Sequence, residues 1–118
     1  MTESTHPVVF FDIGCKDLDK TTTFYQSLFG WTPSGIPFAN LLNTGSLEGI
    51  QGQITALGHE PHNYVIVYIQ VDDISSHLDR IIAAGGQKLV GPVTLPNGKQ
   101  FAWFKDLEGT TMGLVTKV

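Results

Sequence analysis

The side chains of this sequence that could take part in chemistry are few and lie far apart along the chain. His59 and His62 form an H-x-x-H pair, a spacing that can clip a metal ion. Pro61 separates the two imidazoles and disfavours the helix that would align them, so a polar linker is the favoured interpretation. His6 is expected in a polar N-terminal tail and His77 on the solvent side of a helix. The histidines alone therefore do not predict a metal centre.

Two further reactive groups follow an apolar stretch near the N-terminus. Asp12 is the candidate for acid–base chemistry, because burial against Phe10 and Tyr68 would make its carboxyl a stronger base. The favoured alternative is a solvated carboxylate, or one that pairs with Lys105. Cys15 precedes a helix start, where a thiol can become reactive, but a plain small residue in a turn is the favoured interpretation.

Strand and helix signals alternate along the chain in the same order twice. Asp17 can cap a first helix that ends at Gly30, and Asp73 can cap a second that ends at Gly85 and Gly86. Apolar residues recur at helical spacing at Leu18, Phe24, Tyr25, Leu28 and Phe29, and again at Ile74, Leu78, Ile81 and Ile82. Strands are expected at 8–13, 38–42, 49–54, 64–71, 87–91, 99–106 and 110–118, while Pro33, Gly35 and Pro37 interrupt the β-rich stretch after the first helix.

The matching order of elements indicates an internal duplication. Asp73 follows Asp17 by 56 residues, and Gly86 follows Gly30 by the same interval. Two similar βα units that arose independently remain the alternative. We predict an α+β protein with a single domain over 1–118, in which modules at 8–57 and 64–117 are joined by a linker at 58–63.

Composition excludes several classes of partner. Of the 118 residues, 42% are hydrophobic and 15% charged, which suits a folded domain with some apolar surface covered by a ligand or a second subunit. The net charge of -4 and the scattered lysines disfavour nucleic acid. The sequence contains neither a long apolar run nor a signal peptide, so a cytoplasmic protein that does not enter a membrane is expected.

Two stretches of the chain are similar to a known superfamily. FFDIGCKDLDKTTTFYQSLFGW (10–31) resembles the opening of vicinal-oxygen-chelate proteins, which include glyoxalase I, bleomycin-resistance proteins and extradiol dioxygenases. VDDI (71–74), AAGG (83–86) and FKDLEG (104–109) match the second half, although Leu107 replaces the usual proline. The resemblance covers about 8–117. It implies two βαβββ modules whose mixed, curled sheets form an open cup, with helices outside, a small-molecule ligand inside and a homodimer.

The same resemblance implies where a metal would bind. Metal-using members carry His, Glu or Gln on the first and last strand of each module. Those positions fall here on Phe10, Ile66 and Gly113, whose side chains have no donor atom, and on 49–52, where Gln51 is the one candidate. We therefore expect neither the family metal nor another cofactor.

Strand alternation predicts which side chains line the cup. On the first strand, Val9, Phe11 and Ile13 suit helix packing, which leaves the opposite face for the ligand. The expected ligand-binding residues are Phe10, Asp12, Gln51, Gln53, Ile66, Tyr68, Gln70, Trp103 and Met112, with Gly113 as an alternative to Met112. Trp103 and Phe104 are neighbours, so one of them faces the cup, and the sequence leaves open which; core or interface packing is an equal alternative for each.

Three functions fit these residues. The first is a metal-free protein that binds a small, partly aromatic molecule, as bleomycin-resistance proteins do. The second is a lyase, isomerase or dioxygenase of the same superfamily, with Asp12 and Tyr68 as candidate catalytic residues if no metal takes part. The third is an interaction module whose cup faces another protein. The sequence ranks binding first and leaves the ligand, and the question of catalysis, open.

Overall fold

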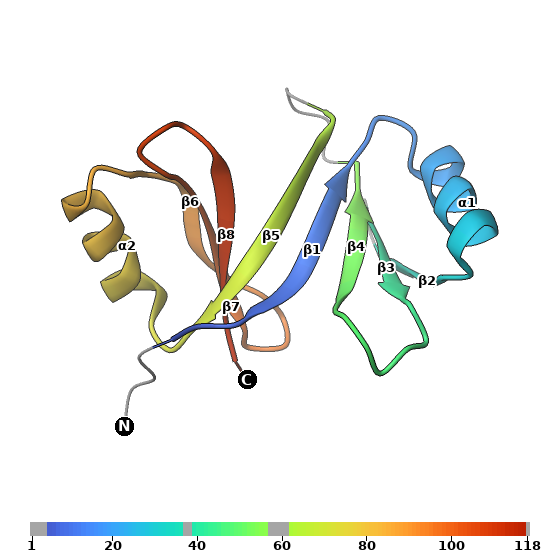
Figure 1. Ribbon diagram of the computed structural model, residues 1–118, viewed down its shortest axis with the longest axis horizontal. Helices are drawn as coiled ribbons and strands as arrows, with labels where there is room; N and C mark the ends of the chain where they lie inside the picture. Colours follow the sequence, from blue (N-terminus) through green and yellow to red (C-terminus); the bar gives the residue numbers. More distant parts are fainter. Residues whose placement is uncertain (1–4, 37–38, 57–61, 118) are drawn as a thin grey trace. The chain divides into compact units, whose positions relative to one another are not determined.

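The computed structural model describes residues 5–36, 39–56 and 62–117 (Figure 1). The elements in these ranges are β1 (Val8–Gly14), α1 (Leu18–Phe29), β2 (Thr32–Ile36), β3 (Ala39–Asn43), β4 (Gln51–Thr55), β5 (Tyr64–Val71), α2 (Ile74–Ala83), β6 (Gln87–Thr94), β7 (Gln100–Lys105) and β8 (Thr111–Thr116). The order βαβββ occurs twice, so the predicted α+β class is confirmed. Most of the predicted linker, His59 included, lies outside the described residues.

The chain divides into two compact units. We call Phe10–Ile66 the N-terminal unit, and Met1–Val9 together with Val67–Val118 the C-terminal unit. The predicted modules at 8–57 and 64–117 differ slightly from these units, because the unit boundaries cut through β1 and β5. Each unit is therefore described by itself.

The N-terminal unit places α1 against one face of its strands. β1 and β4 pair in parallel, while β3 pairs antiparallel with both β4 and β2. The Asp17 side chain accepts a hydrogen bond from the backbone N–H of Lys20 at 3.0 Å, which satisfies a free donor at the helix start. Gly30 ends the helix in the left-handed region, with φ 73°, and its N–H donates to the carbonyl of Gln26. Both predicted helix ends are confirmed.

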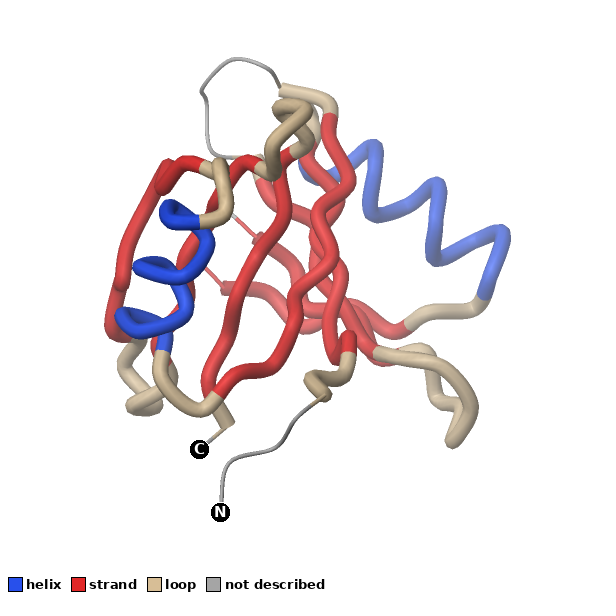
Figure 2. Tube along the Cα trace, turned by 60° about the vertical axis from the view of Figure 1, so that its left-hand side comes forward, coloured by secondary structure: helices blue, strands red, loops and turns tan. Residues whose placement is uncertain are grey.

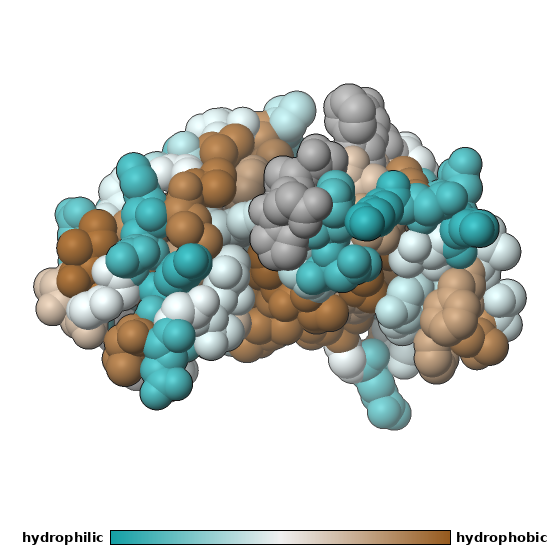
Figure 3. All heavy atoms as spheres, turned by 90° about the horizontal axis from the view of Figure 1, so that it is seen from above, coloured by the Kyte–Doolittle hydropathy of each residue, from teal (hydrophilic) through white to brown (hydrophobic). Residues whose placement is uncertain are grey.

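The core of the N-terminal unit lies under α1. It consists of the buried residues Cys15, Leu42 and Ile54, against which Phe11, Ile13, Leu18, Tyr25, Trp31 and Ala56 pack. The core covers only some of the apolar side chains of α1. Phe24, Leu28 and Phe29 are each more than half exposed. Figure 3 shows such apolar surface (brown) interspersed with hydrophilic surface on the face in view. The helical spacing therefore identifies the helix, but overstates how many of its apolar residues are buried.

The C-terminal unit repeats this arrangement with α2. β5 and β8 pair in parallel, and β7 pairs antiparallel with both β8 and β6. α2 lies along the strands of its own unit (Figure 2). The core consists of Val71, Ile74, Leu78, Ala102, Phe104 and Leu114, with Ile69, Ile81 and Met112 packed against it. Ile82, expected on the inner face of α2, is 52% exposed, so that part of the prediction is wrong.

Two strands differ from the sequence-based expectation. β2 forms at Thr32–Ile36 although Pro33 lies within it, because β2 pairs on one side only, with β3, and an edge position tolerates a residue without an N–H. β6 runs to Thr94, beyond the expected 87–91, through register shifts against β7 and a cis peptide bond at Gly91-Pro92. Neither helix in the described ranges has the length and apolar character needed to cross a bilayer.

Candidate ligand-binding faces

The face of the N-terminal strands that lies opposite α1 carries polar residues in rows across the sheet. Residues in register on neighbouring strands project to the same side of a sheet. One row consists of Asp12, Gln53, Leu41 and Ser34, and the next contains Phe10 and Gln51 on β1 and β4 with Asn43 and Thr32 on β3 and β2. A third row contains Gly14, Thr55 and Ala39. We call these three rows the polar face. The predicted lining residues Phe10, Asp12, Gln51 and Gln53 all lie on it.

Asp12 is the buried centre of the polar face. Its side chain is only 2% exposed. Oδ1 accepts a hydrogen bond from the Thr55 hydroxyl at 2.8 Å, and Oδ2 accepts one from the Gln53 amide at 3.2 Å. A buried carboxylate needs such donors to offset the loss of water. The favoured expectation of a solvated Asp12 is therefore wrong, and the carboxylate is instead oriented by fixed donors.

Tyr64 extends this hydrogen-bonded group. Its hydroxyl lies 2.8 Å from Thr55 Oγ1. Its ring covers Gly14, where an added Cβ would overlap the ring carbons, so the glycine provides the space that the ring occupies. Burial raises the pKa of Tyr64 above its ordinary value of 10.0, the negative charge of Asp12 also raises it, and the hydrogen bond with Thr55 lowers it. The phenol therefore stays protonated at neutral pH.

Tyr64→Phe is expected to reduce the loss of stability at high pH. Because the folded-state pKa of Tyr64 is raised, its contribution to stability is complete below about pH 10 and is lost as the pH rises through the folded-state pKa. Urea unfolding of wild type and variant between pH 8 and pH 11 measures this difference. Parallel decreases in the two proteins over that range would contradict the environment described for Tyr64.

A depression of about 400 Å³ opens on the β2–β3–β4 side of the N-terminal unit. It is lined by Thr32, Ser34, Leu41, Leu42, Asn43 and Gln51. Its volume is within the usual range for small-molecule sites, and its lining combines hydroxyl and amide groups with the exposed leucine Leu41. Most of these lining residues belong to the rows of the polar face, so the depression lies beside the Asp12 hydrogen bonds.

The corresponding face of the C-terminal unit is aromatic. Tyr68, Gly113 and Trp103 lie in register on β5, β8 and β7, and Trp103 Nε1 donates a hydrogen bond to the Tyr68 hydroxyl at 2.7 Å. Phe104 is instead buried in the core under α2. The choice that the sequence left open is thus settled, since Trp103 and not Phe104 shares the face of Tyr68. Gln70 lies one row further along, in register with Val115.

Of the other predicted lining residues, Met112 lies on the opposite side of its strand and Ile66 lies on the predicted side. Met112 is in register with Phe104 and packs against the core under α2, so it points away from the face of Tyr68 and Gly113. The sequence-based alternation of β8 was wrong by one residue, because Gly113 and not Met112 lies in register with Trp103. Ile66 lies two residues from Tyr64 on the predicted side of β5, and its side chain is almost completely buried there.

The positions where the resemblance places metal ligands carry few donor atoms. Phe10 and Ile66 have hydrocarbon side chains, and Gly113 has none. The ring of Tyr68 fills the space into which a side chain at Gly113 would project. Gln51 lies in register with Phe10, but its Oε1 accepts from the Thr44 backbone N–H at 2.7 Å and its Nε2 donates to the Thr44 hydroxyl at 3.1 Å. Both ends of this amide are therefore used to anchor the chain between β3 and β4.

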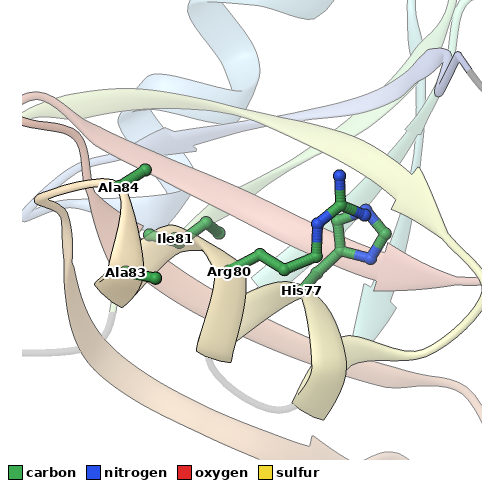
Figure 4. A pocket seen from close by; sticks show the side chains of 5 residues that line it. All are labelled: His77, Arg80, Ile81, Ala83 and Ala84. Atoms are coloured by element: carbon green, nitrogen blue, oxygen red, sulfur yellow. The ribbon is translucent and has the colours of Figure 1, made fainter.

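The remaining candidate groups among the described residues are divided between the two units. In the described ranges, no three or more His, Cys, Asp or Glu side chains form a metal-binding group. The His6 and His77 rings lie edge to face, with centroids 4.7 Å apart, and His77 and Arg80 line a shallow depression of about 550 Å³ along α2 (Figure 4). The positive charge of Arg80 disfavours a cation there. Cys15 is buried and its thiol donates to the Thr55 carbonyl at 3.5 Å, as expected for a structural residue.

The fold defines a class of protein, an α+β chain in which a βαβββ module occurs twice. Residues 6–114 match the model of the Glyoxalase/Bleomycin resistance protein/Dioxygenase superfamily, and the chain belongs to that family. The resemblance seen in the sequence is thereby confirmed.

The relatives found by comparison share modest sequence identity with this chain. It is 26% identical over 115 residues to a glyoxylase-like domain-containing protein of Didymella fabae, which covers 90% of both chains. It is 27% identical over 126 residues to the anthracycline biosynthesis protein DnrV of Streptomyces peucetius, where the match covers 92% of this chain but only 46% of that protein. The methylmalonyl-CoA epimerase of Mycobacterium tuberculosis superposes with a TM-score of 0.67 and 15% identity, over 100% of this chain and 93% of the epimerase. This structural likeness shows the fold.

Sequence reasoning missed two members of the Asp12 group. Thr55 comes at the end of a short strand, and Tyr64 was grouped with β5 without a role. Strand alternation was the available signal. It places Asp12 of β1 and Thr55 of β4 on the face of their strands that lies opposite α1. The parallel pairing of β1 with β4, which sequence alone does not specify, was needed to bring them together.

Proposed function

We propose that this chain binds a small, partly aromatic organic molecule on the polar face, without the metal used by other members of its family. The observation that carries the proposal is the depression of about 400 Å³ lined by Ser34, Leu41 and Gln51, on the same face of the strands as the buried carboxylate of Asp12. An apolar side chain among a few fixed polar groups is the usual composition of a small-molecule site. The name of the Streptomyces peucetius relative, an anthracycline biosynthesis protein, supports an aromatic ligand.

The chemistry of the metal positions supports a metal-free site. A divalent ion needs several oxygen, nitrogen or sulfur donors at fixed distances. Phe10, Ile66 and Gly113 offer no side-chain donor, and both ends of the Gln51 amide are bound to Thr44. Binding by shape and hydrogen bonding does not need such donors, so it fits these residues better than Lewis-acid chemistry.

A metal-free enzyme is the second candidate, and Asp12 is the observation that favours it. A carboxylate that is shielded from water and held by Thr55 and Gln53 could accept a proton from a bound molecule. The same two hydrogen bonds already engage both carboxylate oxygens. Tyr68, the other candidate, accepts from Trp103 and is 6% exposed, which suits a packing role. Binding therefore remains the first choice.

Leu41→Arg is expected to abolish binding of an aromatic probe while the fold remains intact. Leu41 is exposed and lines the depression, so a long charged side chain there fills the space at little cost to stability. The matched control is Leu47→Arg, at a fully exposed leucine outside the depression. A thermal-shift titration with 2-naphthol and with an anthracycline, in the presence and absence of EDTA, measures the effect.

Wild type and Leu47→Arg should be stabilised by at least one of these probes, by about 2.7 kcal/mol when the free probe is at 100 times its Kd. Leu41→Arg should show no such shift, and EDTA should change nothing. No stabilisation of wild type by either probe would argue against the binding function. Loss of binding in EDTA, restored by a divalent metal, would replace the metal-free proposal with the metal-dependent one.

A further inference from the structure

The depression on the polar face offers a ligand several polar side chains. Two hydroxyls and two amides line it, from Thr32, Ser34, Asn43 and Gln51. A hydroxyl rotates, so it can donate to one ligand and accept from another. An amide is different, because its donor nitrogen and its acceptor oxygen are separate atoms. The partners of the two amides therefore decide which hydrogen bond the depression offers in a fixed position.

The Gln51 amide is bound to the chain at both ends. Its Oε1 accepts from the Thr44 backbone N–H at 2.7 Å, and its Nε2 donates to the Thr44 hydroxyl at 3.1 Å. These two bonds hold the residue that directly follows Asn43. Gln51 therefore fixes the chain at the end of β3 instead of offering its amide to a ligand.

The Asn43 amide is bound at one end only. Its Oδ1 accepts from the backbone N–H of Gly45 at 2.8 Å. A backbone N–H can only donate, so the atom that faces it is the carbonyl oxygen, and this bond fixes which way round the amide lies. Within 5–36, 39–56 and 62–117, its Nδ2 has no acceptor in the protein. Asn43 thus brings a donor of fixed orientation to the depression that it lines.

We propose that Asn43 donates a hydrogen bond from Nδ2 to a carbonyl oxygen of the bound molecule, so that the depression selects uncharged aromatic ketones or quinones. This inference rests on the proposed binding function and adds the chemical class of its ligand. Asn43 is the specificity-determining residue, and the bonds from Gly45 and to Thr44 keep it in place. Leu41, which lines the same depression, supplies the apolar contact for a ring.

The charges around the depression favour an uncharged molecule. None of the six residues that line it is ionisable. An ion seated there would lose water without meeting an opposite charge in the lining. The charged side chain of the segment 44–50 is Glu48, and the buried Asp12 lies on the same face of the strands, so an anion would also be repelled. A carbonyl oxygen needs only one donor and costs far less to desolvate than a charge.

The test compares 2-acetylnaphthalene with 2-isopropenylnaphthalene, which has the same rings and a similar outline but a methylene group in place of the carbonyl oxygen. NMR titration gives the ratio of the two dissociation constants. Asn43→Ala should reduce the relative affinity for the ketone about 2- to 10-fold compared with wild type, the range for one hydrogen bond. Asn43→Asp keeps the acceptor for Gly45 but has no donor, and should reduce the relative affinity at least as much, because its carboxylate also repels the carbonyl oxygen.

Asn97→Asp is the matched control. Asn97 is exposed and outside the depression, and its Oδ1 accepts from the backbone N–H two residues further on, that of Lys99, at 2.9 Å. This variant should keep the wild-type ratio, whereas a variant that only loosens the fold weakens both probes and leaves the ratio unchanged. Wild type should bind the anion 2-naphthoate more weakly than the ketone.

Three results would overturn the inference: no binding of the ketone by wild type, an unchanged ratio in either Asn43 variant, or tighter binding of 2-naphthoate than of the ketone. Each of them leaves the binding function standing as long as 2-naphthol or the anthracycline still stabilises wild type. The binding function itself fails only if those two probes do not bind.

Discussion

Gly113→Ala is expected to destabilise the protein by about 2–3 kcal/mol, the range for a side chain forced into a packed interior. Gly113 is buried on β8, and an added Cβ would overlap ring carbons of Tyr68 on the neighbouring strand. Tyr68 is 6% exposed, and its hydroxyl accepts a hydrogen bond from Trp103, so its ring cannot move without breaking that bond. One methyl group thus disturbs three strands.

Urea unfolding measures this effect, with Gly35→Ala as the matched control. Gly35 lies on β2 with a negative φ, and an added Cβ there would meet only the Asn40 side chain, at 3.4 Å. That substitution should change the free energy of unfolding by less than about 0.5 kcal/mol. Removing the ring in Tyr68→Ala should make Gly113→Ala much less costly, because the overlap is then absent. Equal unfolding midpoints for the two alanine variants would contradict the close packing described here.

The same packing bears on the family's metal. A ligand at Gly113 cannot be introduced by one substitution, because the ring of Tyr68 already occupies the space that its side chain needs. Two other glycines have aromatic rings over them in the same way, Gly14 under Tyr64 and Gly52 under Phe11. Such pairs fill the gap that a glycine leaves between strands. Gly113 therefore packs against an aromatic ring at a position where the resemblance in the sequence implies a metal ligand in metal-using members.

Local signals in the sequence predicted the elements of the fold well. Helix ends depend on a few neighbouring residues, and so Asp17, Gly30 and Asp73 could be assigned from the sequence. Strand alternation likewise placed Phe10 and Asp12 on the side opposite the helix. These assignments need no knowledge of which strands pair.

Features that depend on strand pairing or on long-range packing could not be predicted from the sequence. The burial of Asp12 results from the parallel pairing of β1 with β4, which brings Gln53 and Thr55 to its carboxylate across about forty residues of chain. Met112 was assigned to the wrong face because the sequence did not define the register of β8. The exposure of Phe24 on α1 shows that periodicity identifies a helix without fixing how much of it the sheet covers.

Asp12→Ala is expected to lower the free energy of unfolding by about 2–3 kcal/mol, because it removes the acceptor of two hydrogen bonds from a buried group. Thr55 is buried, so water does not replace the lost carboxylate, whereas the half-buried Gln53 amide can turn towards solvent. Asp12→Asn should cost about 1 kcal/mol, since its carbonyl oxygen still accepts from Thr55 while the charge is lost. Urea unfolding at pH 7 should therefore give the order Asp, Asn, Ala.

The opposite order would also have a clear physical meaning. Burying a carboxylate costs several kcal/mol, and its hydrogen bonds need not repay that cost in full. If Asp12→Ala were as stable as wild type, the bonds from Thr55 and Gln53 would not outweigh this desolvation, and the stability argument for Asp12 would be wrong. Asp12→Asn separates the hydrogen bond from the charge, because the carboxamide oxygen still accepts from Thr55 while the side chain carries no charge to desolvate.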